Sequence, residues 1–355
     1  MNYEINNIGD ILECFDILNS DEKYVEIIKH IYVKAENELS ATKIIFPNYT
    51  DHTINHSKKV LGYVYAVLNQ TLGKSTDTSK NKSLDLKTGL NINETFILIC
   101  AILLHDIAMA TAYDKNGKEK PLYVTKITDE ERNYIRDNHA KLGEKKIKKE
   151  ARQWFKNFGS PIFTGFIASV VSNHTQNITL IHDETALNIR LKLLSALLKL
   201  GDALHITKDR ADINDLNSFL IENDSVFHWG LVHFVESITI NKFDFFVKFR
   251  FYDDTNNSER IKKKVSYDVL KNLRANKNNN NENNILYVLR NYGIPIEIDF
   301  YTTEDSKIID DISNSAKEML NNVLNEKLKF VAPPPFKTYS KIRDESNNSN
   351  ILGGN

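Results

Sequence analysis

An unbroken run of apolar residues that ends in a histidine and an aspartate constrains this chain most. Residues 97–104 read Ile-Leu-Ile-Cys-Ala-Ile-Leu-Leu, and His105 and Asp106 follow directly. Such a run predicts a buried core element of a soluble protein, and it is too short to span a membrane. Histidine and aspartate rarely enter a core unless a partner satisfies them. The structural alternative is that His105 is a hydrogen-bonded core histidine and Asp106 a helix cap.

Two further apolar helices are expected to end in polar residues of the same type. The spacing of apolar residues predicts a helix over 162–174 that ends at His174, and a helix over 187–200 that is followed by Asp202. We expect Asn93 to cap the central helix. One buried polar residue can arise by chance, but repetition on separate helices predicts convergence on one point. The expected solvent-facing positions of the 187–200 helix are Arg190, Lys192 and Lys199.

A polar segment at residues 46–57 contributes two more histidines. His52 and His56 are four residues apart, so on a helix they would share one face. Thr50 or Asp51 could cap that helix. Two histidines at this spacing, next to an acidic residue, could act together as metal ligands. The alternative is a polar helix start whose histidines bond to the backbone.

Composition places the chain among ordinary globular proteins and excludes several classes of site. With 355 residues it predicts one large domain with an appendage, or two domains. The formal net charge of −1 gives no global basic field for nucleic acid. Cys14 and Cys100 form no disulfide framework, and together with the lack of a signal peptide they predict a reducing, cytoplasmic compartment. Neither a phosphate-binding glycine loop nor a nucleophile-elbow serine is present in the sequence.

The periodicity predicts four regions along the chain. Residues 1–45 form an N-terminal helical segment and 46–235 the main helical domain, which includes a charged helix from Asp129 with His139 on its apolar side. Residues 236–330 form a small α+β extension, and 331–355 a flexible tail rich in proline, serine and asparagine. Within the extension we expect strands after residue 236 and over 295–301, and helices over 264–274, 285–291 and 305–328.

The order of the polar residues resembles that of the HD superfamily of metal-dependent phosphohydrolases. Residues 55–60, 101–109 and 197–204 carry the resemblance, which covers roughly residues 45–240. The runs 49–52 and 202–206 look like the HD branch found in bacterial conflict systems, whose members are often joined to a chaperone-type ATPase domain. No such ATPase domain is visible in this sequence. The resemblance implies a mainly α fold, an HD-domain helical bundle, with the small α+β region as a C-terminal extension.

The resemblance also implies a metal centre. The ligands that it assigns to one divalent ion are His56, His105, Asp106 and Asp202. His139 and His174 match the positions that bind a second ion in two-metal members, with Asp106 as the bridge. Related sequences often have a His-His pair where this chain has Asn138-His139, so one ion and two ions both stay open. Mixed imidazole and carboxylate ligation suits Mn, Fe, Ni, Co or Zn, with Mg as a further candidate.

The implied activity is hydrolysis of a phosphoester in a nucleotide or nucleotide-like substrate through a metal-activated water, in a protein of anti-phage defence. Basic side chains must offset the phosphate charge, and Lys208 and Arg210 are the better candidates because they follow Asp202 closely. Asp51 and His52 could supply a supporting acid or a proton shuttle. The other basic candidates are Lys58, Arg132, Arg136 and Lys141.

Two other readings of the function stay open. A single-strand nuclease would need a basic groove, which the near-neutral net charge disfavours. A non-catalytic sensor would hold a metal or nucleotide and control a protein partner through the C-terminal tail. No membrane association is expected, and a homo-oligomer is compatible with the sequence.

Overall fold

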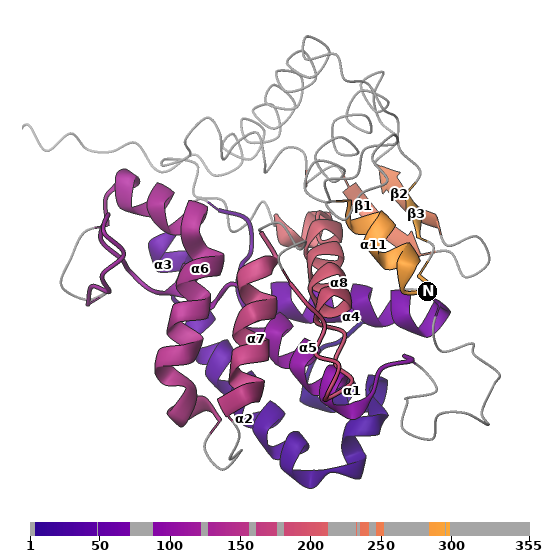
Figure 1. Ribbon diagram of the computed structural model, residues 1–355. Helices are drawn as coiled ribbons and strands as arrows, with labels where there is room; N and C mark the ends of the chain where they lie inside the picture. Colours follow the sequence, from indigo (N-terminus) through magenta and orange to yellow (C-terminus); the bar gives the residue numbers. More distant parts are fainter. Residues whose placement is uncertain are drawn as a thin grey trace, which may run out of the picture.

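The fold is mainly helical, as the sequence predicts (Figure 1). The computed structural model describes residues 4–47, 49–71, 88–121, 127–155, 161–175, 181–211, 232, 235–240, 246–251, 284–294 and 296–298. The α-helices are α1 (Ile8–Cys14), α2 (Glu22–Leu39), α3 (Thr42–Ile45), α4 (Ile54–Thr71), α5 (Ile92–Leu104), α6 (Asp129–Trp154), α7 (Pro161–Asn173), α8 (Leu191–Leu204) and α11 (Ile285–Asn291). The short 3₁₀ helices are η1 (Asp16–Ser20), η3 (Ile107–Ala110) and η5 (Lys208–Arg210).

Helix α5 is the centre of the helical region. It contacts α2, α4, α7 and α8, and every residue from Glu94 to Leu104 is buried. The segment Ile92–Ala110 is long and apolar enough to cross a membrane by length and composition alone, but 89% of it is buried inside the protein. That burial is what a core helix requires, because its apolar side chains are hydrophobic all round and must be covered by neighbouring helices.

A buried acid joins the beginning of α5 to the beginning of α8. Asn91, rather than the expected Asn93, caps α5, and it forms a reciprocal capping box with Glu94. Arg190 Nε lies 2.7 Å from Glu94 Oε1 and its NH2 lies 2.6 Å from Oε2. Arg190 is therefore a bidentate partner of a fully buried carboxylate, and the prediction that it faces solvent is wrong. Loss of one partner of such a pair costs about 3–5 kcal/mol.

Helix α8 begins and ends later than predicted, and this places Asp202 inside its last turn. The expected helix ended at residue 200, whereas α8 spans Leu191–Leu204 with His205 as its C-cap. Lys199, predicted to face solvent, is only 6% exposed. At Gly201 a Cβ would lie 2.7 Å from Val64 Cγ2 and 3.1 Å from the carbonyl oxygen of Val60, both on α4. Glycine thus lets α8 approach α4 closely, and this contact brings Asp202 toward α4.

Helix α4 begins after His52, so the expected shared helix face of His52 and His56 is wrong. The helix starts at Ile54, and Asp51 Oδ1 accepts a hydrogen bond from the Thr53 backbone N–H at 2.9 Å. The backbone N–H of Asp51 donates to the Arg210 carbonyl at 2.8 Å. This contact ties the segment before α4 to η5, which follows α8.

A small sheet stands next to the helices. Strand β1 (Val235–Ile240) pairs antiparallel with β2 (Phe246–Phe251), which pairs parallel with β3 (Glu297–Ile298). Helix α11 packs on α8 and thereby connects this region to the helical core (Figure 1). The strands after residue 236 and the helix over 285–291 agree with the sequence prediction. The helices expected over 264–274 and 305–328, and the tail, lie outside the described residues. The boundaries between the four expected regions stay predictions.

Candidate metal centre

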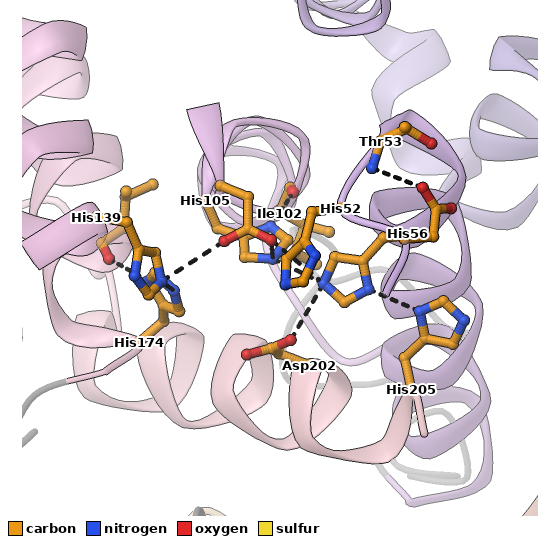
Figure 2. A network of polar contacts seen from close by, with 12 residues as sticks. His52, Thr53, His56, Ile102, His105, His139, His174, Asp202 and His205 are labelled. Atoms are coloured by element: carbon orange, nitrogen blue, oxygen red, sulfur yellow. Dashed lines mark hydrogen bonds and ion pairs between the residues drawn. The ribbon is translucent and has the colours of Figure 1, made fainter. Parts of the chain in front are cut away.

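Imidazole and carboxylate side chains from three helices meet at the end of α5 (Figure 2). His56 comes from the first turn of α4, Asp202 from the last turn of α8, and His105 and Asp106 follow α5. His56 Nε2 lies 3.1 Å from His105 Nε2, 3.6 Å from Asp106 Oδ2 and 3.1 Å from Asp202 Oδ1. His56, His105 and Asp106 each offer a ligand atom within 4.8 Å of the others, and Asp202 joins them through His56. We call these four residues the first ligand group.

A second ligand group lies on the other side of the same aspartate. It consists of Asp106, His139 of α6 and His174, which follows α7, and its ligand atoms also lie within 4.8 Å of one another. His139 Nε2 lies 3.0 Å from His174 Nε2 and 3.6 Å from Asp106 Oδ1. Asn138, where related sequences have a histidine, turns back to its own helix and donates to the Tyr134 carbonyl at 2.9 Å.

Asp106 divides its two carboxylate oxygens between the groups. Oδ2 faces His105 at 3.2 Å and His56 at 3.6 Å, whereas Oδ1 faces His139 at 3.6 Å. Asp106 is 4% exposed, and Oδ2 has no hydrogen-bond partner among the described residues. A buried carboxylate oxygen without a donor is costly unless a cation stands beside it.

Backbone carbonyls fix the tautomers of three of these histidines. The Nδ1 atoms of His105, His139 and His174 lie 2.8, 2.6 and 2.6 Å from the carbonyl oxygens of Ile102, Arg136 and Val171. Since a carbonyl only accepts, each Nδ1 carries a proton and donates it. Each Nε2 then directs a lone pair into the site when the ring is neutral. This is how proteins orient metal-binding imidazoles.

The arrangement of these nitrogen and oxygen atoms is suited to binding a cation between them. When both rings are neutral, the facing Nε2 atoms of His139 and His174 would direct lone pair at lone pair across 3.0 Å. Burial lowers the pKa of His174 to about 3, so its ring is neutral at pH 7. The unpaired Asp106 oxygen and these facing lone pairs are donor atoms suited to a divalent ion.

A proton would compete with a metal for the first ligand group. Burial alone would lower the pKa of His105, but the charge of Asp106 outweighs it and raises that pKa to about 9. Burial would raise the pKa of Asp202, but the hydrogen bond and charge of His56 hold it well below its usual value. A metal must therefore displace a proton from His105, since ligands bind in their deprotonated form.

The predicted basic and acid-base residues fall into two sets. Arg210 lies beside the first ligand group: its NH1 donates to the His205 carbonyl at 2.8 Å and its NH2 to His52 Nε2 at 3.2 Å. The His52 ring centre is 5.7 Å from that of His56. Lys208 is exposed on η5, and Asp51 accepts the Thr53 N–H at the beginning of α4. The roles assigned to these residues stay predictions.

The remaining basic candidates bind elsewhere or face solvent. Lys58 donates to the Asn6 carbonyl at 3.1 Å. Arg132 donates to the Ile45 carbonyl at 2.8 Å, and Arg136 donates to the Tyr49 hydroxyl at 3.2 Å. Lys141 is exposed on α6. Among the candidates, these contacts therefore favour Arg210 for recognition of an anionic ligand.

Sequence reasoning assigned no role to His205, although the structure places it in the site. His205 caps the end of α8, is 1% exposed, and its Nδ1 lies 2.7 Å from Nδ1 of His56 (Figure 2). The spacing indicates only that His205 lies near Asp202, because residues three apart on a helix are neighbours on one face.

Comparison with known families places the site in context. A family model described as HD-CE matches residues 46–275, which include both ligand groups. No curated protein and no solved structure matches the chain.

Proposed function

The chain belongs to the HD-CE family, and from this premise we propose that it is a metal-dependent phosphohydrolase that cleaves a phosphoester of a nucleotide or nucleotide-like substrate. The family and the His/Asp cluster together indicate a metal-dependent hydrolase of the HD type. The substrate class is the further step of the proposal. A role in anti-phage defence is likewise a proposal, based on the association of this type of HD domain with conflict systems.

The observation that carries the proposal is the convergence of ligand atoms on both oxygens of Asp106. His56, His105, Asp106 and Asp202 would hold one ion, and His139 and His174 with Asp106 a second. A divalent ion held there supplies an activated water and a Lewis acid for a phosphoryl oxygen. Imidazole nitrogens with carboxylates suit Mn, Fe, Ni, Co or Zn, with Mg as a further candidate.

Exposure of the ligands indicates where a substrate would enter. The side chains of His56 and His105 are fully buried, whereas that of Asp202 is 30% exposed and that of His139 18% exposed. A phosphoester would therefore approach past Asp202 and His139, with the apolar end of α5 behind the site. The buried wall excludes water from that side and strengthens each electrostatic contact.

Arg210 is our candidate for binding the phosphate. NH1 donates one N–H to the His205 carbonyl, and NH2 donates one N–H to His52 Nε2. Each of these nitrogens carries a second N–H that could bind an anionic ligand. His52 donates its Nδ1–H to the Thr50 carbonyl at 2.6 Å, so its Nε2 accepts from Arg210. Burial and the charge of Arg210 lower the pKa of His52 to about 4. A neutral His52 that accepts from Arg210 positions the guanidinium, and we assign it this role in place of proton transfer.

The test is a substrate panel with the full-length protein loaded with Mn²⁺. The panel contains nucleoside mono- and triphosphates, cyclic nucleotides and single-stranded DNA, and the assay measures release of phosphate, pyrophosphate or nucleotide. Asp106→Asn is the matched control, because it keeps the shape of the side chain and removes its charge. We expect turnover of at least one nucleotide that the control lacks.

The alternatives are outcomes of the same panel. Cleavage of single-stranded DNA alone would replace the proposal by a nuclease. Nucleotide binding without turnover at any metal concentration would replace it by a sensor. Absence of any transition metal from the purified protein, even after Mn²⁺ is offered, would remove its basis.

A further inference from the structure

His56 lacks the backbone support that orients the other three histidines. The carbonyl of Thr53, three residues before His56, accepts the backbone N–H of His56 at 3.0 Å. The Nδ1 atom of His56 instead faces Nδ1 of His205 at 2.7 Å. In the position where His105, His139 and His174 each have a carbonyl oxygen, His56 has a ring nitrogen from another helix.

The two imidazoles are arranged edge to edge. Their ring centres are 4.9 Å apart and their planes differ by only 14°. A separation this large, with the Nδ1 atoms only 2.7 Å apart, places both nitrogens close to the line that joins the ring centres. Hydrogen bonds are strongest when the proton lies on such a line. His56 and His205 are 0% and 1% exposed, so water does not compete for the contact.

One proton must lie between the facing nitrogens, and the ring to which it is bonded decides what His56 can bind. If the proton is bonded to Nδ1 of His205, neutral His56 is protonated on Nε2 and donates that N–H to Asp202 Oδ1 at 3.1 Å. If the proton is bonded to Nδ1 of His56, the Nε2 atom of His56 directs a lone pair toward His105, Asp106 and Asp202. Only the second arrangement allows His56 to be a metal ligand.

We propose that His205 is a positioning residue for the metal centre, whose Nδ1 accepts the Nδ1–H of His56 and so keeps the His56 Nε2 lone pair directed at the ion. This inference rests on the metal centre of the proposed function. It requires the proton of neutral His205 to stand on Nε2. That atom is buried, has no hydrogen-bond partner among the described residues, and faces Asp209 Oδ1 at 3.9 Å, so a carboxylate stands on the side where the N–H points.

Two variants separate the acceptor from the shape of His205. In His205→Asn the side-chain oxygen can take the place of Nδ1 and accept from His56. In His205→Phe a ring of similar shape remains, but the acceptor is lost. Calorimetric titration of the metal-stripped full-length proteins with Mn²⁺ should show affinity at the first ligand group reduced by about 10- to 100-fold in the Phe variant, as for other residues that orient a ligand. The Asn variant should stay within about threefold of wild type.

Two further measurements keep a folding defect from imitating this result. Thermal unfolding of the metal-free proteins should show both variants cooperatively folded at the titration temperature, with the Phe variant less stable than the Asn variant by at most about 1–3 kcal/mol, because it leaves a buried ring nitrogen of His56 without a partner. In ¹⁵N-resolved spectra of the Zn²⁺-loaded wild type, His56 should carry its proton on Nδ1 and His205 on Nε2.

The outcomes also separate this inference from the proposed function. Wild type that binds no metal defeats the proposed function itself. Wild type that binds metal, with a Phe variant of equal affinity, overturns only the role of His205. Equal losses of affinity in both variants, or a Zn²⁺-loaded His56 protonated on Nε2, would overturn it as well.

Discussion

The two ligand groups share Asp106 but differ in charge and burial. The first group adds a second carboxylate, Asp202, to two fully buried imidazoles. The second adds only imidazoles, and the side chain of His139 is 18% exposed. A divalent ion gains more from two carboxylates than from one. From this difference we expect the first group to bind a divalent ion more tightly than the second and to exchange it less readily.

The groups also differ in what holds their ligands. His139 and His174 are oriented by carbonyls of their own helices, and α6 and α7 pack directly at Gly143, whose added Cβ would lie 3.2 Å from Val171 Cγ1. His56 and Asp202 depend on the contact between α4 and α8 at Gly201. The first group is therefore the stronger site by charge and the more sensitive one to packing.

The largest effect should follow from removal of the shared ligand. Asp106→Ala should abolish metal binding at both groups, because each loses its bridging oxygen. Phosphohydrolase activity should fall by about a thousandfold or more, since several kcal/mol of stabilisation by the ion disappear. Metal analysis after dialysis measures the loss of metal binding, and an assay of phosphate release measures the loss of activity. A variant that keeps one equivalent of metal with native helicity would show that the groups are independent of Asp106.

A smaller, one-sided effect should follow from Asp202→Asn. The substitution removes a charge from the first group and keeps the shape of the side chain, so the ion there should bind at least about 100-fold more weakly, beyond the loss expected for a supporting residue. The second group, which lacks Asp202, should keep its affinity. Titration with Mn²⁺, followed by electron paramagnetic resonance, counts the ions. Equal weakening of both groups would contradict the division of ligands.

The converse variant is His139→Ala combined with His174→Ala. It removes both imidazoles of the second group, and one ion should remain bound with its affinity nearly unchanged. Its matched control is His30→Ala with His182→Ala, which removes two exposed histidines and should change neither stoichiometry nor activity. Full activity with a single ion in the test variant would mean that the chain is a one-metal enzyme.

The sequence predicted the core helix and the residues at its end, because apolar periodicity and a terminal His-Asp pair are local signals. It placed His52 and His56 on one helix face, which is wrong because Asp51 and Thr53 delay the start of α4 to Ile54. It treated Arg190 as solvent-facing, since spacing cannot reveal a buried partner on another helix.

The contact of His205 with His56 joins residues 149 apart in the chain, so no local pattern could predict it. Lys199 illustrates the same limit. Its charge indicates solvent exposure, and yet the position that it occupies on α8 is buried. The convergence of helices can be expected from repeated polar ends, but which atoms face one another depends on the packing of α4, α5 and α8.

The last prediction uses that packing to weaken one group without touching a ligand. In Gly201→Ala the new Cβ would stand 2.7 Å from Val64 Cγ2 and 3.1 Å from the Val60 carbonyl oxygen, so α8 must move away from α4. Overpacking of this kind costs about 1–3 kcal/mol, partly offset by about 1 kcal/mol from the better helix propensity of alanine. A severalfold loss of metal affinity at the first group alone should accompany a lower unfolding midpoint.

The control is Gly165→Ala on α7, where an added Cβ meets nothing within 4 Å. There alanine should raise the free energy of unfolding by up to about 1 kcal/mol, through helix propensity alone, and leave both groups unchanged. Denaturant unfolding and Mn²⁺ titration of the two variants give the comparison. If Gly201→Ala weakened the second group as much as the first, the two groups would respond to packing as a single unit, and their separate dependence on α4–α8 and α6–α7 would be wrong.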